Sequence, residues 1–391
     1  MKLLLNGNEA AALAAKLARV QVISAYPITP QTVVVETLAK YVADGELDAE
    51  FVKVESEHSA LSVCLGASAA GARAFTATSS QGLMLMSEIL YVVSGMRLPV
   101  VMANANRSLS APLSIWNDQQ DSLSVRDSGW IQLYCENNQE ILDLLLQAFL
   151  LAERISLPAM VCYDGYILSH TAEAVEVPEQ AEVDAFLPPY SPAFKLDPSR
   201  PLTMGPVGVP EVYMEARYLQ HRDMRRAKEE FVRVTEEFRR RFGRKYGILE
   251  EYRTEDAELL LFTMGSLMGT VREAVDRCRE KGEKVGAVKL TLYRPFPEQE
   301  VVRALSRGKV VGILEKDIST GWMGALYTDT VAAFANESKR PLFQNFILGL
   351  GSRDVRVEDV EGIVARLKKV VEEGRVEENP CWIGVKKELV E

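Results

Sequence analysis

Short apolar runs alternate with longer segments of helical periodicity through the first part of the chain. Runs rich in Val, Ile, Phe and Ala predict buried strands at 21–26, 51–54, 74–78, 99–105 and 159–163. Apolar residues at three- and four-residue steps predict helices between them, at 7–17, 31–39, 60–72 and 83–93. This alternation is typical of a mostly parallel, doubly wound sheet.

The pattern changes near residue 177. Prolines concentrated between 178 and 210 predict an irregular linker. One long amphipathic helix is predicted at 211–242, with its apolar stripe at Met224, Ala227, Phe231, Val234, Phe238 and Phe242. A second α/β unit follows, with a helix at 269–281 and strands at 259–264, 284–292, 310–315 and 342–348. We therefore expect an α/β protein of two doubly wound domains, at 1–176 and 251–391, joined by a linker and long helix at 177–250.

Composition narrows the class of protein. A chain of 391 residues is long enough for two domains, and 47% hydrophobic with 26% charged residues is typical of soluble globular proteins. The net charge of −10 argues against a nucleic-acid or anionic-membrane partner. No apolar run approaches the roughly 20 residues that span a bilayer, and the first residues do not form a signal peptide. We therefore expect a cytoplasmic protein.

The cysteines are scattered, at Cys64, Cys135, Cys162, Cys278 and Cys381. Their spacing fits neither a zinc site nor an iron–sulfur cluster, so we expect no metal ligands in this chain. Buried thiols in a reducing compartment are the better interpretation.

Candidate chemistry concentrates where the 51–54 strand meets the following helix. Glu55, Glu57 and His58 lie there within four residues. The carboxyl end of a strand in an open α/β sheet borders the crevice where ligands bind. These side chains are therefore candidates for acid–base work.

Three further polar residues follow other predicted strands. Thr29 lies in a proline-rigid loop, where it either binds a ligand or caps the next helix. Ser80 lies in a strand-to-helix turn, which either offers donors to a ligand or is simply a tight turn. Arg107 suits capture of a small carboxylate, but an ion pair with Asp118 or Asp121 is equally compatible with the sequence.

These motifs, in this order, resemble those of one family: the α chains of the thiamine diphosphate-dependent 2-oxoacid:ferredoxin oxidoreductases, such as those of pyruvate synthase. The resemblance runs from about residue 7 to 366, and the joint occurrence of the motifs is specific although each alone is weak. The matching stretches are 25–32 (AYPITPQT), 55–60 (ESEHSA), 76–83 (TATSSQGL), 106–108 (NRS), 163–165 (YDG) and 293–297 (YRPFP).

The resemblance implies a role for each site residue. Residue Glu57 would hydrogen-bond N1′ of the thiamine aminopyrimidine and so promote formation of the nucleophilic ylid, with Glu55 as a structural neighbour and His58 unassigned. Thr29 and Arg107 would hold the 2-oxoacid, Arg107 through its carboxylate. Thr29 and Ser80 would also contact the cofactor. The first domain would be the transketolase-like pyrimidine-binding half of the site, and the second a transketolase C-terminal-like domain.

The sequence lacks the other half of a thiamine site. Neither Asp44-Gly45 nor Asp164-Gly165 is preceded by the glycine of the Gly-Asp-Gly motif that binds Mg²⁺ and diphosphate. The resemblance therefore implies a β subunit carrying Mg²⁺ and the diphosphate half-site. It also implies γ- and ferredoxin-like δ-type subunits, [4Fe-4S] clusters on partner chains, coenzyme A as co-substrate, and ferredoxin as electron acceptor.

The implied reaction is the reversible, CoA-dependent oxidative decarboxylation of a 2-oxoacid to acyl-CoA and CO₂, with reduction of ferredoxin. Thr29 with Arg107 favours a monocarboxylic substrate, most readily pyruvate. A branched-chain acid such as 2-oxoisovalerate is the alternative, as is a subunit retained for assembly without catalysis.

Overall fold

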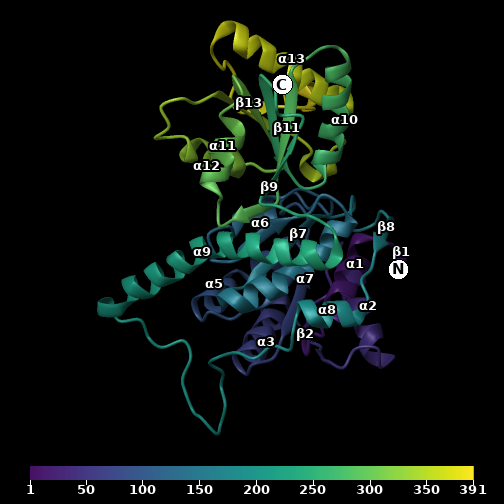
Figure 1. Cartoon of the computed structure of the whole chain (residues 1–391), viewed down its shortest axis with the longest axis vertical. Coiled ribbons are helices and arrows are strands. Elements are labelled where there is room, and N and C mark those ends of the chain that lie inside the picture. Colours follow the sequence, from purple (N-terminus) through teal and green to yellow (C-terminus); the bar gives the residue numbers. More distant parts are fainter. Residues whose placement is uncertain (391) are drawn as a thin grey trace.

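The computed structural model describes residues 1–390 and consists of two stacked α/β domains (Figure 1). Domain I is built on a seven-stranded sheet of order β12-β6-β7-β5-β4-β2-β3. Its strands are β2 (Val22–Ser24), β3 (Glu50–Val52), β4 (Ala74–Thr78), β5 (Val101–Asn106), β6 (Ile131–Tyr134), β7 (Ala159–Asp164) and β12 (Leu292–Arg294). All neighbouring strands are parallel except β12, which is antiparallel to β6.

The strand order places a topological switch point between β2 and β4. From β2 the chain moves outward to β3, and it then returns to the other side of β2 with β4. The loops at the carboxyl ends of β2 and β4 diverge at such a point and leave a crevice, which is where open α/β sheets bind ligands. The predicted doubly wound sheet is confirmed, and Thr29 and Ser80 follow the carboxyl ends of β2 and β4.

Helices cover both faces of this sheet. One face carries α1 (Gly7–Leu17), α2 (Thr32–Ala43) and α7 (Asn138–Ile155), and the other α3 (Glu57–Ala69), α4 (Ser80–Leu85), α5 (Ser87–Gly95) and α6 (Gln120–Ser124). Asn6 and Glu9 form a reciprocal capping box that fixes the start of α1. Its alanines are fully buried and allow close packing against α7.

Helix boundaries depart from the sequence prediction in two places. Helix α3 begins at Glu57 rather than residue 60, because the Ser56 hydroxyl accepts the Ser59 backbone N–H at 3.2 Å. The predicted 83–93 helix is two helices that meet at Met86. Helix α7 was not predicted; nearly all of its residues are buried, including the polar Glu140, Asp143 and Gln147.

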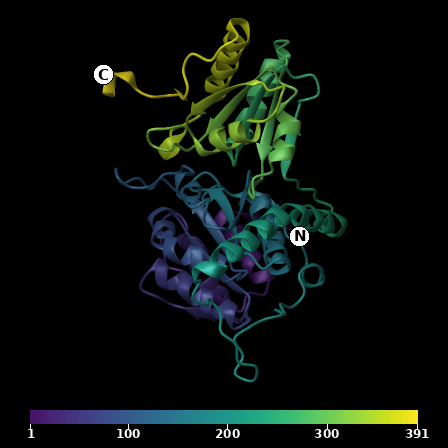
Figure 2. The same ribbon diagram turned by 90° about the vertical axis from the view of Figure 1, so that its left-hand side faces the viewer.

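The linker leads through α8 (Gln180–Phe186) into α9 (Pro210–Phe242), which confirms the predicted long helix. The apolar stripe of α9 packs on α7 through Ala227, Phe231, Val234 and Phe238, all fully buried. Residues 211–219 are exposed instead, and both views show this end of α9 and the preceding loop projecting from domain I (Figures 1 and 2).

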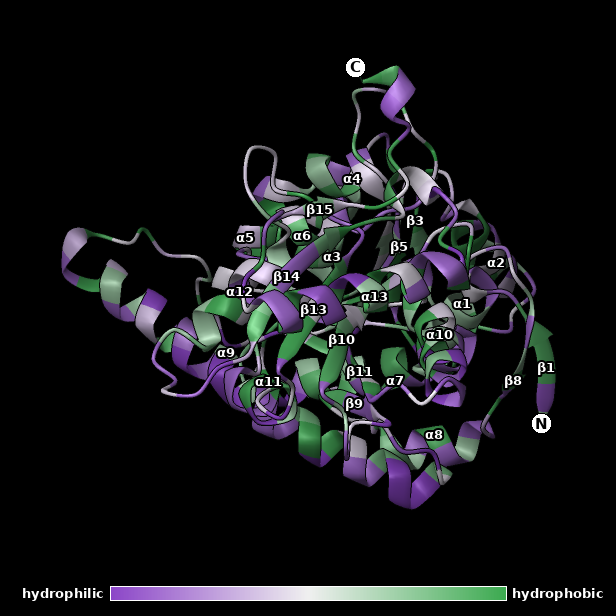
Figure 3. Cartoon of the chain, turned by 90° about the horizontal axis from the view of Figure 1, so that it is seen from above, coloured by the Kyte–Doolittle hydropathy of each residue, from purple (hydrophilic) through white to green (hydrophobic). Residues whose placement is uncertain are grey.

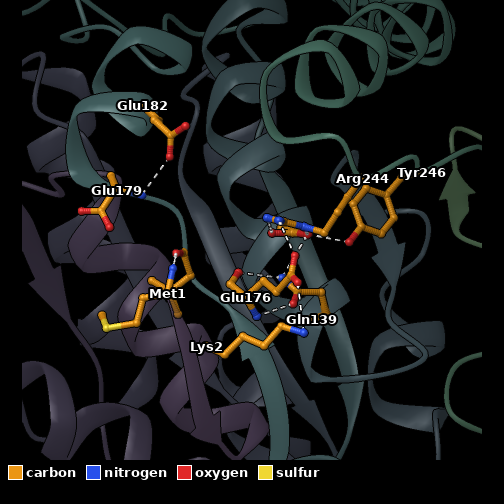
Figure 4. Close-up of polar contacts among 10 residues, drawn as sticks. Met1, Lys2, Gln139, Glu176, Glu179, Glu182, Arg244 and Tyr246 are labelled. Carbon is orange, nitrogen blue, oxygen red and sulfur yellow. Dashed lines mark hydrogen bonds and ion pairs between the residues drawn. The ribbon is translucent and has the colours of Figure 1, made fainter.

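The start and end of this linker region are tied to domain I. Strands β1 (Lys2–Leu5) and β8 (Glu173–Glu176) pair antiparallel, and the Met1 amino group donates to the Val177 carbonyl at 3.0 Å. Gln139 on α7 exchanges two hydrogen bonds with the Glu176 backbone, at 2.6 and 3.0 Å (Figure 4). Beyond α9, Arg244 and Tyr246 both donate to the carboxylate of Asp143, which is fully buried.

Domain II is a six-stranded sheet of order β15-β14-β13-β10-β11-β9, antiparallel only at β9. Helices α10 (Leu267–Glu280) and α13 (Val357–Glu373) cover one face, and α11 (Glu298–Leu305) and α12 (Ala325–Ala333) the other. The inner strands are predominantly hydrophobic (Figure 3). The strands are β9 (Leu249–Tyr252), β10 (Leu259–Met264), β11 (Val285–Leu290), β13 (Val310–Glu315), β14 (Leu342–Ile347) and β15 (Cys381–Trp382).

The two domains share structure. The strand predicted at 284–292 is in fact split: β11 ends at Leu290 in the domain II sheet, and β12 then joins the edge of the domain I sheet. The Thr291 carbonyl between them accepts the Tyr134 N–H at 2.9 Å, which directs the chain across. One apolar cluster also runs from α3 and α5 of domain I to β10 and α11 of domain II. None of the helices within residues 1–390 is long and apolar enough to cross a membrane.

Candidate active site

Glu57 is the first residue of α3, at the carboxyl end of β3, and only 7% of it is exposed. Burial raises the pKa of its carboxyl group. No side chain within residues 1–390 donates a hydrogen bond to it. A desolvated carboxyl without a protein partner is costly unless a ligand supplies the missing donor.

Gly82 on α4 gives this carboxylate its space. A Cβ at Gly82 would lie 2.7 Å from Glu57 Oε1 and 2.6 Å from Thr78 Oγ1, both too close for real contacts. The Thr78 hydroxyl is itself buried without a hydrogen-bond partner in the described chain. From the sequence, this turn either offers donors to a ligand or is simply a tight turn; in the structure its glycine makes room for the Glu57 carboxylate.

The sequence neighbours Glu55 and His58 contact residues other than Glu57. Glu55 accepts a hydrogen bond from the Ser59 hydroxyl, which lowers the pKa of its exposed carboxyl group. His58 is partly exposed, with its Nε2 3.6 Å from the Glu88 carboxylate. The cluster that looked like an acid–base group in sequence is therefore spread over different surroundings in space.

Thr29 is exposed in the loop after β2, and its carbonyl accepts a hydrogen bond from Arg107 Nη1 at 2.8 Å. It does not cap α2, whose N-cap is Gln31. Gln31 is fully buried and fixes the loop by donating from Nε2 to the carbonyls of Tyr26 and Ala77, at 3.2 and 2.6 Å. The sequence analysis missed this role, although the residue stood within a quoted motif.

Arg107 directly follows β5 and is 7% exposed. Its Nε donates to the Ser114 carbonyl at 2.9 Å, while Nη2 has no acceptor within residues 1–390. No carboxylate of the described chain lies within ion-pair distance of the guanidinium, so the ion pair with Asp118 or Asp121 does not form. Burial lowers its pKa. A buried guanidinium without a counter-ion suits a small carboxylate ligand.

Asp121 organises the backbone between these residues. It is fully buried, and it accepts the backbone N–H groups of Ser80 and Arg107, at 2.9 and 3.1 Å, and the Asn106 amide at 2.7 Å. Burial raises its pKa to about 6. The sequence flagged Asp121 only as an ion-pair partner for Arg107. The structure gives it a different task, which no local motif signals.

Ser80 is fully buried at the start of α4 with φ of 48°. Its hydroxyl lies 2.5 Å from the Ser108 carbonyl and 2.6 Å from Gln81 Oε1. A hydroxyl has one hydrogen and donates to one acceptor at a time. When it donates to Ser108, the Ser80 hydroxyl connects the turn after β4 to the segment after β5 that contains Arg107. Its predicted contact with the cofactor stays a prediction.

The structure thus brings the predicted residues to one sheet edge. Thr29 and Arg107 are joined directly by a hydrogen bond, and Ser80 joins Arg107 through Asp121. Glu57 packs against Gly82, two residues beyond Ser80. Within the described residues, Glu57 has no side-chain donor and Arg107 has no carboxylate partner.

The fold defines a two-domain protein of the transketolase type. A split-gene transketolase, solved as an inactive β4 tetramer, has a TM-score of 0.54 at 12% identity, covering 93% of this chain and 97% of that chain. A 2-oxoglutarate:ferredoxin oxidoreductase from Magnetococcus marinus, solved with 2-oxoglutarate, coenzyme A and succinyl-CoA, has a TM-score of 0.70 at 25% identity. The match covers 95% of this chain and 65% of that chain.

Family comparisons narrow the class. The profile described as "Pyruvate flavodoxin/ferredoxin oxidoreductase, thiamine diP-bdg" matches residues 13–236, and "Pyruvate:ferredoxin oxidoreductase core domain II" matches 257–360. The chain therefore belongs to the pyruvate flavodoxin/ferredoxin oxidoreductase family, and its first domain is of the thiamine diphosphate-binding type. The resemblance drawn from the motifs is confirmed.

Relatives match over the whole chain. Pyruvate synthase subunit PorA of Pyrococcus abyssi is 54% identical, over 100% of both chains. The PorA subunit of Methanothermobacter thermautotrophicus is 50% identical, over 98% of both. Ketoisovalerate oxidoreductase subunit VorA of Pyrococcus abyssi is 46% identical, over 99% of this chain and 98% of its own.

Proposed function

We propose that this chain is the α-type subunit of a multi-subunit pyruvate:ferredoxin oxidoreductase. The proposed reaction converts pyruvate, coenzyme A and oxidised ferredoxin to acetyl-CoA, CO₂ and reduced ferredoxin, and it is reversible. The observation that carries this proposal is Glu57, a buried acid without a side-chain donor, which follows β3 in a domain of the thiamine diphosphate-binding type.

The residues present fit the pyrimidine half of thiamine diphosphate. The Gly82 surface leaves room against Glu57 that a single Cβ would fill. A ring nitrogen hydrogen-bonded to this carboxyl would supply the donor that the protein does not provide. When bound, thiamine diphosphate supplies a nucleophilic carbon and an electron sink for decarboxylation. The task of Glu57 is to hold a proton between its carboxyl oxygen and that ring nitrogen.

Arg107 and Thr29 form the proposed 2-oxoacid site. The free Nη2 of Arg107 donates to the substrate carboxylate, and burial strengthens this pairing. Thr29 presents an exposed side chain beside the guanidinium, and its hydroxyl binds substrate or cofactor. Ser80 supports the cofactor side of the crevice by holding the turn around Gly82.

The remaining chemistry is proposed to lie on partner chains. The β subunit would bring the Mg²⁺-diphosphate half-site, while γ- and δ-type subunits would bring the [4Fe-4S] clusters that pass electrons to ferredoxin. The missing Gly-Asp-Gly motif and the five buried, unpaired cysteines of this chain support that division. Free thiols also support a reducing, cytoplasmic location.

A branched-chain 2-oxoacid is the second candidate substrate. The VorA relative, at 46% identity, covers nearly the whole chain, so the architecture alone does not separate the two substrates. The higher identity to PorA, 54%, favours pyruvate. Turnover of pyruvate, 2-oxoisovalerate and 2-oxoglutarate by the complex, with coenzyme A and a low-potential acceptor, discriminates them, and preference for 2-oxoisovalerate would replace pyruvate in the proposal.

Substitution Glu57→Gln tests the site itself in the assembled complex. The glutamine amide cannot exchange a proton with the ring nitrogen of the cofactor as the Glu57 carboxyl does. We therefore expect kcat to fall by about 10²-fold or more. Glu55→Gln is the matched control, because this nearby acid is exposed and bonded only to Ser59. Unchanged turnover in Glu57→Gln would contradict the assignment and favour the non-catalytic alternative.

A further inference from the structure

The segment that carries Arg107, residues 106–120, lies between the two domains. It leaves domain I at the carboxyl end of β5 and meets residues that follow β10, β13 and β14 of domain II. Backbone and side-chain hydrogen bonds bind it to Lys316, Ile318 and Ser352. The path of the segment is therefore set by both domains.

Lys316 provides the most buried of these contacts. It is 5% exposed, and its ammonium lies 3.0 Å from the Asp164 carboxylate, itself 1% exposed at the end of β7. Asp164 also accepts the amides of Asn117 and Gln119, at 3.2 and 3.3 Å. The Lys316 carbonyl accepts the Gln119 N–H at 2.8 Å. One lysine thus holds the segment by side chain and backbone.

Asn117 connects Asp164 to Asn106, the residue before Arg107. Its amide donates both to Asp164 and to the Asn106 carbonyl, the latter at 3.2 Å. That carbonyl also accepts the Gly165 N–H at 3.1 Å. Gly165 must be glycine, because a Cβ would lie 2.5 Å from the same oxygen. The position of the backbone just before Arg107 therefore depends on Asp164 and on Lys316, which pairs with it.

Ser352 provides a second, independent contact. Its hydroxyl accepts the Asn117 N–H at 2.7 Å, and its own N–H donates to the Asn117 carbonyl at 2.6 Å. The neighbouring Gly351 N–H reaches Asp118, which also accepts the Ser108 hydroxyl at 2.6 Å. These hydrogen bonds fix residues 117 and 118, which follow Arg107 in the segment, against domain II.

We propose that domain II positions the substrate-binding guanidinium of Arg107, with Lys316 and Ser352 as positioning residues. This deepens, and rests on, the proposed role of Arg107 in binding the 2-oxoacid carboxylate. Two guanidinium nitrogens are occupied by the carbonyls of Ser114 and Thr29, so the direction of the third follows the backbone of the segment. Loosening the segment misplaces that donor without touching the cofactor half-site.

The first test compares Lys316→Met with Lys281→Met in the complete complex. Lys281 is an exposed domain II lysine paired with Glu361, so its variant controls for the chemical change. In Lys316→Met we expect the KM for pyruvate to rise about tenfold, the scale of a modest misplacement. The KM for coenzyme A and the affinity for thiamine diphosphate stay unchanged. A purely structural role would lower the amount of folded enzyme and leave the pyruvate KM of the remainder unaltered.

Lys316→Met leaves a buried carboxylate unpaired, so two milder variants accompany it. Lys316→Arg keeps the charge and is expected to restore most of the pyruvate KM. Ser352→Gly removes the side chain with its hydroxyl acceptor, and glycine tolerates the φ of 55° at this position. We expect its pyruvate KM to rise several-fold, in the same direction as that of Lys316→Met.

Hydrogen–deuterium exchange on the full chain gives a readout without turnover. We expect faster exchange in peptides covering 106–120 for Lys316→Met and Ser352→Gly, and no change for Lys281→Met. Unchanged exchange together with an unchanged pyruvate KM overturns the proposal. Arg107→Gln separates it from the proposed function: if this variant leaves the pyruvate KM unaltered, the substrate assignment fails, whereas a raised KM in Arg107→Gln alone overturns only the role of domain II.

Discussion

At the scale of single residues, the site depends on what surrounds each charged group. Glu57 and Arg107 are both nearly buried, and each lacks an oppositely charged or donating protein partner in the described chain. Other buried charged groups have protein partners: Arg73 pairs with Glu153 at 2.6 Å, and Asp121 accepts several hydrogen bonds. Because an unpaired buried charge costs free energy, these two positions are the ones that a ligand would stabilise.

Gly82→Ala is expected to separate activity from stability. The added Cβ would meet Glu57 Oε1 at 2.7 Å and Thr78 Oγ1 at 2.6 Å, so both side chains must rotate away while the backbone fold persists. We expect kcat of the complex to fall by about tenfold or more, with little change in Tm of the chain.

The control for this variant is Gly66→Ala on α3, where a Cβ would meet nothing within 4 Å. We expect it to keep full activity and to equal or exceed the wild-type Tm, since alanine is the better helix former. Full activity in Gly82→Ala would show that the space beside Glu57 is not needed by the cofactor.

At the scale of elements, α12 shows how a helix can begin without a local cap. Its N-cap is Gly324, which has no side chain to accept the first N–H groups. Glu315, at the end of β13, accepts them instead, from Leu326 at 2.7 Å and Tyr327 at 2.9 Å, and Asp317 accepts that of Ala325. The sequence therefore gave no start signal for this helix.

This cap predicts a pH dependence. Burial, and then the charge of Asp317, raises the pKa of Glu315 to about 8. The folded state keeps the proton at pH values where the unfolded chain has lost it. The stabilisation by Glu315 is therefore fully present below its unfolded pKa, about 4.3, and is lost as the pH rises through about 8.

We expect the urea midpoint of the isolated chain to fall less between pH 5 and pH 9 in Glu315→Gln than in wild type. The difference corresponds to about 4 kcal/mol at most. Glu372→Gln, an exposed change on α13, should follow the wild-type curve. Parallel curves for wild type and Glu315→Gln would contradict the raised pKa.

At the scale of the whole molecule, a buried ion network joins the domains. Lys289 on β11 is 2% exposed, and its ammonium lies 2.8 Å from Glu136 and 2.6 Å from Glu140 of domain I. Arg272 of α10 also contacts Glu136, at 3.1 Å. The network and the crossing of β12 fix domain II on domain I, which the positioning of Arg107 requires.

Removing one member should leave buried carboxylates without a counter-ion. We expect Lys289→Met to destabilise the chain by about 3–5 kcal/mol in urea unfolding. Adding Glu140→Gln should recover part of that loss, because one of the stranded charges is removed. Lys284→Met, at an exposed ion pair with Glu258, is the control and should change stability little. If Lys289→Met and Lys284→Met changed the free energy of unfolding equally, the buried network between the domains would contribute no more than an exposed ion pair.

Much of the fold was predictable because strand and helix periodicities are local properties. Strands β2, β3, β4, β5 and β7, with α1 and α9, follow from local patterns and are found close to their expected positions, whereas β6 was not predicted. Helix α7 was missed although its polar residues Glu140, Asp143 and Gln147 recur at helical spacing, and α12 was missed because its cap comes from a distant strand. The crossing of β12 depends on a pairing with β6 that is far away in the sequence.

The sequence by itself determined the α/β class, the family, and which side chains could do chemistry: Glu57, Thr29, Ser80 and Arg107. These follow from residue type and spacing, which the chain carries locally. Only the tertiary structure shows that Arg107 has no counter-ion and that Gly82 makes room for Glu57. It also shows that Lys316 binds the segment at 106–120 through Asp164 and through its own carbonyl. Burial and pairing depend on segments brought together across 150 residues or more, and it is burial and pairing that set the energy of a charge.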